Sequence, residues 1–152
     1  MENKNNKSDV SAKEAYVKEL QKQGYNAQIV KAPADIKAEK DGQTWYFEIK
    51  KTSHADKYFG AATMTEWKQA LEAPTHYRFV IAIELGEDKW DFKEYTPAEF
   101  MEYSTIPPFK VYFNIDFSNN GKKSKKGKSN AVKMSPGNFN KLTKVYEQLD
   151  RG

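Results

Sequence analysis

Three residues in the first third of the chain, Asp35, Glu48 and Lys50, could act together on one substrate. Glu48 and Lys50 stand two residues apart in a predicted strand, so their side chains should share one face. Asp35 stands at the start of the preceding predicted strand, and the Asp41-Gly42 pair between the two strands is typical of a hairpin turn. Because Asp35 and Glu48 lie about equally far from that turn, we expect them to be cross-strand neighbours.

Two acids and a lysine at one end of a hairpin suit the hydrolysis of phosphodiester bonds. Such carboxylates can hold Mg²⁺ or Mn²⁺, which prefer oxygen ligands, and the backbone carbonyl of Ile49 could be another ligand. The ion would polarise a phosphoryl oxygen and activate a water, while Lys50 would orient that water or stabilise the transition state. The residues alone leave open a plain surface hairpin with a Glu–Lys pair and an Asp that caps a turn.

A helix should precede the hairpin and cover it. Ser8 or Ser11 is expected near its start, since Ser11 and Glu14 fit a capping box, and Gly24 is a good C-terminal stop. Residues 1–7 before it are expected to be a disordered arm. The apolar stripe of this helix is predicted to consist of Val10, Ala15, Val17 and Leu20.

Three strands, a short helix, two more strands and a second short helix are predicted up to about residue 103. Thr63 or Thr65 could cap a short helix, and Thr96 with Glu99 fits a second capping box. The apolar run that begins at Tyr77 is typical of a strand at the centre of a sheet. The predicted strands cover residues 25–30, 35–39, 43–51, 77–83 and 90–95.

The C-terminal elaboration, residues 85–152, is expected to complete a single domain over residues 8–152. Residues 110–117 alternate between apolar and polar side chains, which predicts a strand, and residues 131–134 could form a returning strand. Ser135-Pro136 should begin a last helix. Apolar side chains expected in this core include Tyr112, Phe113, Phe117 and Phe139. The predicted fold class is α/β (α+β), a mixed sheet flanked by helices.

Pro33-Ala34-Asp35, followed after twelve residues by Glu48-Ile49-Lys50, resembles the motif of the PD-(D/E)xK nuclease superfamily. The predicted element order over residues 8–84 is similar to the αβββαβ core of its restriction-endonuclease-like fold. The resemblance is to the Mrr-like, Holliday-junction-resolvase-like or NO VEIN C-terminal branch, and the residues do not choose among them. One departure is Ala34, because the signature places Pro directly before Asp.

The resemblance implies a role for each residue of the motif. Asp35 and Glu48 would ligate the metal, and Lys50 would be the catalytic lysine. Some members of the superfamily carry an acid on the first helix that reaches the metal. Glu14 matches that acid best in this sequence, and Glu19 is the weaker candidate.

The net charge of +4 comes from one segment rather than from the whole surface. Without the five lysines of residues 119–130, 20 basic residues remain of 25, against 21 acidic ones, a net of −1. These lysines predict sequence-independent contact with a nucleic acid backbone, although a solvated loop is the plainer alternative. Lys51 and Thr52, next to the motif, are expected to contact a phosphate or to form a polar loop. The lysines of the segment are Lys122, Lys123, Lys125, Lys126 and Lys128.

Composition excludes several classes of protein. With 38% hydrophobic and 30% charged residues, the chain is too apolar for a disordered protein and too charged for a membrane protein. The absence of cysteine excludes disulfides and thiolate zinc sites. Because the first nine residues are almost all polar, no secretory signal is expected, and we expect a cytoplasmic protein.

We therefore expect a Mg²⁺- or Mn²⁺-dependent endonuclease that acts on DNA, with RNA as an open alternative. A homodimer would let two such sites cut both strands, and no membrane partner is expected. A second interpretation is a catalytically silent nuclease-fold module that binds nucleic acid or a protein. A third is a plain α/β interaction domain with a fortuitous triad.

Overall fold

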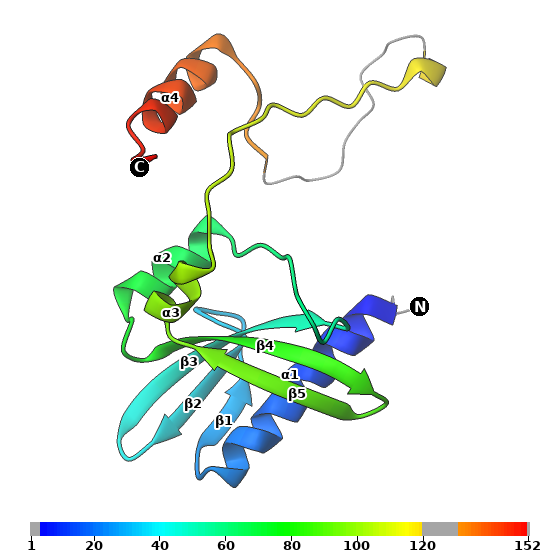
Figure 1. The fold of residues 1–152 in the computed structure, drawn as a ribbon, viewed down its shortest axis with the longest axis vertical. Helices are drawn as coiled ribbons and strands as arrows, with labels where there is room; N and C mark the ends of the chain where they lie inside the picture. The colour runs from blue at the N-terminus through cyan, green and yellow to red at the C-terminus, as the bar shows by residue number, and fades with distance from the viewer. Residues whose placement is uncertain (1–3, 120–130, 152) are drawn as a thin grey trace. The chain divides into compact units, whose positions relative to one another are not determined.

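The computed structural model describes residues 4–119 and 131–151 (Figure 1). The chain divides into two compact units, Met1–Thr105 and Ile106–Gly152. The first unit holds Asp35, Glu48 and Lys50 together with the sheet that carries them. The expectation of a single domain over residues 8–152 stays a prediction.

The first unit is built from one sheet and the helices that flank it. The order of its first six elements, helix-strand-strand-strand-helix-strand, confirms the predicted αβββαβ order. The helices are α1 (Lys4–Lys22), α2 (Met64–Glu72) and α3 (Pro97–Glu102), and the strands are β1 (Asn26–Ile29), β2 (Ile36–Lys40), β3 (Gln43–Thr52), β4 (Tyr77–Gly86) and β5 (Lys89–Tyr95).

The five strands lie in sequence order across the sheet, β1-β2-β3-β4-β5. Neighbouring strands are antiparallel except for β3 and β4, which are parallel. Parallel strands need a crossover connection, and α2 lies in it. The mixed sheet with flanking helices confirms the predicted fold class.

The turn between β2 and β3 follows from the two residues that form it. Asp41 has φ 53° and Gly42 has φ 76°, the left-handed conformation that a two-residue hairpin turn requires. The turn fixes the register of the hairpin, in which Lys40 pairs with Gln43 and Ile36 with Phe47. The hairpin predicted from Asp41-Gly42 is therefore confirmed.

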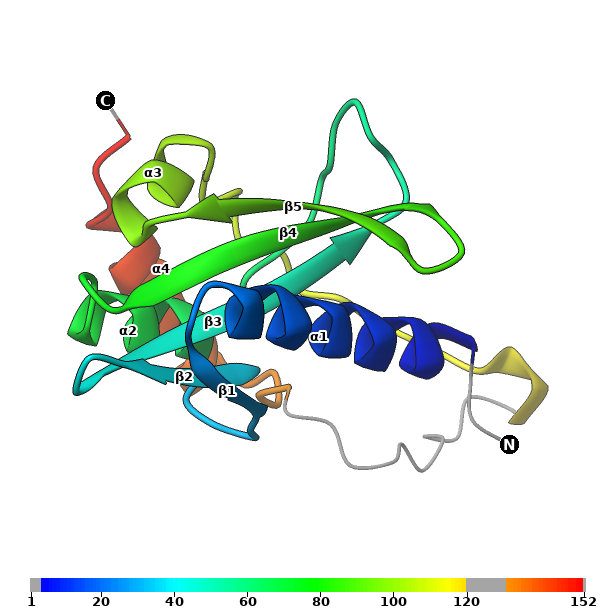
Figure 2. The ribbon, with the colours of Figure 1, turned by 90° about the horizontal axis from the view of Figure 1, so that it is seen from below.

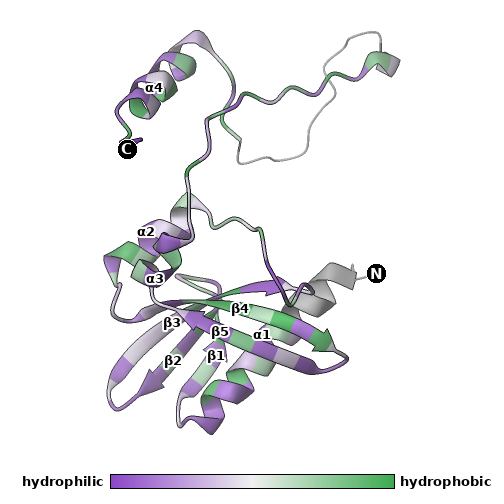
Figure 3. Ribbon diagram, viewed as in Figure 1, coloured by the Kyte–Doolittle hydropathy of each residue, from purple (hydrophilic) through white to green (hydrophobic). Residues whose placement is uncertain are grey.

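β4 is the most deeply buried strand of the sheet and lies between β3 and β5. Phe79, Val80 and Ala82 are fully buried, and Figure 3 shows the hydrophobic colour gathered along this strand. Side chains of β4 point alternately to the two faces and join two separate buried clusters. The predicted burial on both faces is confirmed, although β3 and not β4 is the middle strand of the five.

α1 covers one face of the sheet (Figure 2). Its buried side chains Ala12, Tyr16 and Leu20 recur every fourth residue and pack with Phe47 of β3 in one cluster. The predicted stripe contained Leu20 but missed the other two, because it was drawn through the valines on a neighbouring side of the helix. The helix begins at Lys4, so the expected start near Ser8 or Ser11 and the expected arm over residues 4–7 are wrong. No Pro or Gly interrupts residues 4–10, and the helix continues through them.

α2 and α3 pack on the opposite face. Trp67 of α2 lies 4.9 Å from Phe79 between ring centroids, and Phe100 of α3 stacks on Phe79 at 4.4 Å. Both helices begin with a complete capping box, Thr63 with Glu66 and Thr96 with Glu99. The aromatic contacts fix both helices on the face that carries Glu48 and Lys50.

The second unit contains η1 (Phe117–Asn119) and α4 (Pro136–Glu147). α4 begins at the predicted Ser135-Pro136, and the Ser135 hydroxyl accepts a hydrogen bond from the Asn138 N–H. The strands predicted over 110–117 and 131–134 are wrong, because a strand needs a paired neighbour and the described part of this unit supplies none. The side chains of Tyr112, Phe113, Phe117 and Phe139, expected in a core, are exposed instead.

No helix in the described part of the chain has the length and apolar character needed to cross a membrane. The cytoplasmic location expected from the sequence stays a prediction.

Candidate active site

The β2–β3 hairpin brings Asp35 and Glu48 side by side. Since Ile36 pairs with Phe47, the next step outward from the turn places Asp35 opposite Glu48. The loop before β2 is closed by the Val30 N–H, which donates to the Asp35 carbonyl at 2.9 Å. The predicted cross-strand arrangement of the two acids is therefore confirmed.

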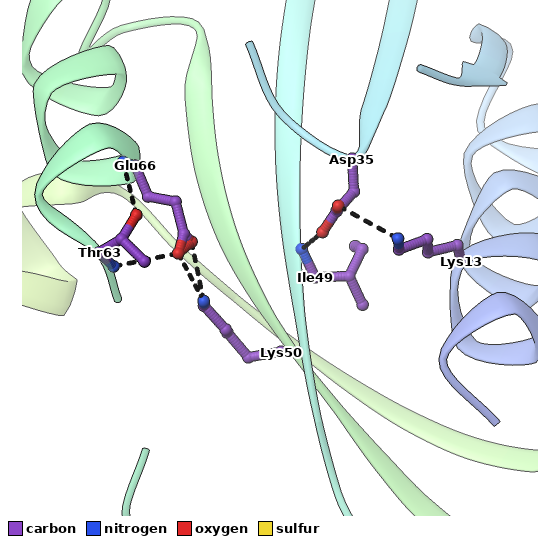
Figure 4. Close-up of polar contacts among 6 residues, drawn as sticks. All are labelled: Lys13, Asp35, Ile49, Lys50, Thr63 and Glu66. Carbon is purple, nitrogen blue, oxygen red and sulfur yellow. Dashed lines mark hydrogen bonds and ion pairs between the residues drawn. The ribbon is translucent and has the colours of Figure 1, made fainter. Parts of the chain in front are cut away.

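Both oxygens of the Asp35 carboxylate are engaged (Figure 4). Oδ2 accepts a hydrogen bond from the Ile49 N–H at 2.8 Å, and Oδ1 lies 3.3 Å from the Lys13 ammonium. Ala34, the residue that separates Pro33 from Asp35, is buried in the cluster that also contains Ala70 of α2. The departure from the Pro-Asp signature therefore has a packing role, and Asp35 is anchored from both sides.

Glu48 shares a hydrogen bond with Asp35. Burial raises the pKa of Glu48 from 4.5 to about 8, helped by that hydrogen bond and by the negative charges of Asp35 and Glu66. Lys50 lowers the pKa of Glu48 by a smaller amount. Near neutral pH the Glu48 carboxyl is thus mostly protonated and donates to Asp35. A cation bound between these two carboxylates would displace the Glu48 proton.

Tyr77 lies beneath these acids at the start of β4. Its side chain is 1% exposed, and its hydroxyl has no hydrogen-bond partner among the described residues. Burial raises the pKa of Tyr77, and the negative charges of Glu48, Glu66 and Asp35 raise it further. A contact with the Glu48 carboxyl makes the smallest contribution, and it does not have the geometry of a hydrogen bond. A buried hydroxyl without a partner is unusual in a folded protein, and this one sits next to the candidate site.

Lys50 directs its ammonium to α2 (Figure 4). Nζ lies 2.8 Å from both carboxylate oxygens of Glu66, and each of these two side chains is 16% exposed. Glu66 in turn accepts a hydrogen bond from the Thr63 N–H at 3.0 Å. Lys50 therefore lies in the candidate site as half of an ion pair.

A pocket of about 300 Å³ opens where these side chains meet. The predicted residues Asp35, Glu48, Ile49, Lys50 and Lys51 all line it, and so does Tyr58. The predicted convergence of two acids and a lysine is thus present in the geometry, whereas the chemical role of each residue stays a prediction. The remaining lining residues are Ala12 and Lys13.

Glu14 and Thr52 do not line the pocket, and Lys51, which does, is paired with an acid. The polar loop considered for Lys51 and Thr52 is wrong, because both residues belong to β3. Glu14 is exposed on α1. Thr52 is buried, and its hydroxyl accepts a hydrogen bond from the His54 N–H at 3.1 Å. Lys51 lies 3.5 Å from Glu84 in an ion pair. The lysines predicted to bind nucleic acid in the C-terminal segment, Lys122, Lys123, Lys125, Lys126 and Lys128, lie outside the described residues.

Two site residues were missed by the sequence reasoning, Lys13 and Glu66. The first helix does reach the site, but through the ammonium of Lys13 instead of the carboxylate of the neighbouring Glu14. Glu66 completes the capping box of α2, and Thr63-x-x-Glu66 is a signal that the sequence contains. No sequence pattern reveals that the same carboxylate also binds Lys50.

The donor set of the site fits a hard divalent cation. Asp35 and Glu48 present carboxylate oxygens to one pocket, and Ile49, the residue after Glu48, lines it too. Mg²⁺ is commonly bound through one or two carboxylates with several waters retained. No group of three or more His, Cys, Asp or Glu side chains suited to a metal occurs among the described residues, so waters or substrate would complete the coordination.

Comparison with protein families adds an independent finding. The model of the family described as "Protein NO VEIN, C-terminal" matches residues 8–94, more than half of the chain of 152 residues. Searches of curated proteins and of solved structures found no match. The match spans α1 to β5, and it contains every residue of the pocket. Of the three branches that the sequence left open, the family match selects one, and the chain belongs to the NO VEIN C-terminal family.

Proposed function

We propose that the first unit is a metal-dependent nuclease domain that hydrolyses phosphodiester bonds of DNA. The observation that carries the proposal is the convergence of Asp35, Glu48 and Lys50 on one pocket. The NO VEIN C-terminal family, which belongs to the PD-(D/E)xK-like nuclease group, supports it. The element order around the pocket agrees with that group as well.

Asp35 and Glu48 would hold Mg²⁺ or Mn²⁺, with the Ile49 backbone carbonyl as a further ligand. When bound, the ion would polarise a phosphoryl oxygen and lower the pKa of a water. The raised pKa of Glu48 supports this role, because a carboxyl that keeps its proton through burial and through the acids around it gives that proton up when a cation binds. Asp35 keeps its position throughout, since the Ile49 N–H holds one of its oxygens.

Lys50 would act on the reacting phosphate or the attacking water. An ammonium beside the scissile bond stabilises negative charge that develops in the transition state. Lys13 and Lys51 line the same pocket and would bind the neighbouring phosphates of the strand. The five lysines of residues 119–130 would add backbone contacts that do not depend on base sequence.

A second candidate function is binding without catalysis. Asp35 is paired with Lys13 and Lys50 with Glu66, so both charges that the chemistry needs have protein partners. In that case the pocket would hold a phosphate of a nucleic acid, or a carboxylate of a partner protein, without cutting it.

Incubation with plasmid, branched and single-stranded DNA, with and without Mn²⁺, tests the proposal. We expect cleavage that requires the ion and is lost in Asp35→Asn. The matched control is Asp41→Asn, the same change at the other end of the same hairpin, where the left-handed backbone suits asparagine. Binding of all three substrates with no cleavage in Mn²⁺ would instead establish the second candidate function.

A further inference from the structure

Glu66 makes two kinds of contact with one carboxylate. Both of its oxygens lie 2.8 Å from the Lys50 Nζ, and Oε1 also accepts the Thr63 N–H at 3.0 Å. The Thr63 hydroxyl accepts the Glu66 N–H at 3.1 Å in return. The acid that binds Lys50 is therefore itself oriented by the start of α2 (Figure 4).

α2 is a fixed platform for this carboxylate. The crossover between the parallel strands β3 and β4 places the helix on the face of the sheet that carries Lys50. Ala70 is fully buried, and Trp67, the residue after Glu66, packs against Phe79 at 4.9 Å between ring centroids. A rotation of α2 that released Lys50 would disrupt these contacts.

A helix cap alone does not account for this geometry. Glu99 occupies the same capping-box position in α3, where it accepts the Thr96 N–H at 2.9 Å. Glu99 is exposed, however, whereas Glu66 is 16% exposed and paired with a lysine of the pocket. Capping needs neither burial nor a cation, so the Lys50 contact of Glu66 calls for another explanation.

We propose that Glu66 is a positioning residue that holds the Lys50 ammonium in place for the reaction. Lysine has a long flexible side chain, and a bidentate acid removes most of its freedom before substrate arrives. An ammonium has three N–H donors, so two can serve Glu66 and one remains for a phosphate oxygen or a water. The inference rests on the proposed nuclease function and assigns it a residue outside the Asp…Glu-x-Lys motif.

The test compares Glu66→Gln with Glu99→Gln. Glutamine is accepted at this position of a capping box, so both variants keep their helix cap and lose only the charge. We expect Glu66→Gln to lower kcat by about 100-fold with little change in KM, because a misplaced group affects mainly the transition state. Glu99→Gln should cleave at the wild-type rate.

A double variant separates positioning from a general loss of structure. If Glu66 acts through Lys50, Glu66→Gln should cause no further loss of kcat in a Lys50→Met background. Glu66→Asp, which keeps the charge, should recover part of the rate. Equal rates for Glu66→Gln and wild type, a faster variant, or additive losses with Lys50→Met would each overturn the inference.

A stability measurement, which does not depend on catalysis, distinguishes this inference from the proposed function. Urea midpoints should show that the effects of Lys50→Met and Glu66→Gln are coupled, whereas those of Lys50→Met and Glu99→Gln should add. An active enzyme without that coupling would overturn the role of Glu66 alone. Coupling in a protein that cuts no substrate would overturn the nuclease function, and with it any catalytic role for Glu66.

Discussion

The ammonium of Lys13 lies 3.3 Å from the carboxylate of Asp35, on the pocket side of α1. Both side chains are partly shielded from solvent, with 29% and 20% of their surface exposed. The lysine therefore provides a positive charge at the carboxylate that is proposed to bind a divalent cation. Lys13 and the ion would compete for the same oxygen.

Lys13→Met should strengthen binding of Mn²⁺. Removing the ammonium frees one Asp35 oxygen and removes repulsion between two cations. A partly exposed ion pair contributes about 1 kcal/mol, which the ion must overcome when it displaces Lys13. Without that cost, Mn²⁺ should bind roughly fivefold more tightly. Isothermal titration with Mn²⁺ measures it, with Lys18→Met, an exposed position of α1, as the control. Weaker binding in Lys13→Met would mean that the lysine organises the site instead of competing for it.

Glu48→Gln should change the pH dependence of stability. The pKa of Glu48 is about 8 in the folded protein and 4.5 in the unfolded chain, so between these values the unfolded chain loses a proton that the folded protein keeps. The contribution of Glu48 to the free energy of unfolding is therefore complete below pH 4.5 and is lost as pH rises to about 8. Allowing for solvent screening, the variant should gain about 1–2 kcal/mol at pH 8 and much less at pH 5.

Urea denaturation at several pH values measures this difference. Glu87→Gln, in the exposed turn after β4, is the matched control and should follow the wild-type pH profile. A parallel profile for Glu48→Gln and wild type would contradict a raised pKa in the folded protein.

Tyr77→Phe should stabilise the metal-free protein. The hydroxyl is buried without a hydrogen-bond partner among the described residues, so its removal relieves a desolvation penalty. We expect the free energy of unfolding to rise by about 1 kcal/mol. A fall in stability would show that the hydroxyl is hydrogen-bonded in solution, either by water or by Glu48.

Tyr16→Phe should destabilise the protein, in contrast to Tyr77→Phe. The Tyr16 hydroxyl donates to Glu94 at 2.7 Å and so connects α1 to β5. The same removal of one oxygen should here lower the free energy of unfolding by about 1 kcal/mol. Urea denaturation of both phenylalanine variants in parallel is the measurement, and a gain in stability for Tyr16→Phe would contradict the contact.

Replacing the five lysines of residues 119–130 by Gln should weaken DNA binding and its dependence on salt. If each lysine neutralises one phosphate, the slope of log affinity against log salt should decrease by up to about 4.5. Fluorescence anisotropy at several salt concentrations measures the slope. An unchanged slope would remove this segment from the proposed interface. As a control, five exposed lysines of the first unit are replaced, Lys18, Lys22, Lys68, Lys89 and Lys93.

The sequence predicted the site where local rules determine it. The Asp41-Gly42 turn and the two-residue period of a strand were enough to place Asp35 opposite Glu48, and to put Glu48 and Lys50 on one face. The element order up to β4 followed from the same rules. These relationships depend on residues that are close in the chain or joined by one short turn.

The missed contacts depend on packing between distant elements. Lys13 reaches Asp35 only because α1 packs against the sheet through Ala12 and Tyr16. The predicted apolar stripe placed a different side of this helix against the sheet. Glu66 reaches Lys50 through the crossover of the parallel strands. In residues 110–117, alternation alone predicted a strand, but a strand forms only where a neighbour pairs with it.

The hairpin turn also offers a practical handle. Gln43 is exposed beside the turn, and five residue steps of roughly 3.3 Å separate it from Glu48, about 17 Å along β3. The chain has no cysteine, so Gln43→Cys would create a single thiol for a fluorophore or a surface tether. A protein immobilised through this point would present its pocket to solution. Single-molecule records of DNA binding could then be made without a label or tether at the pocket itself.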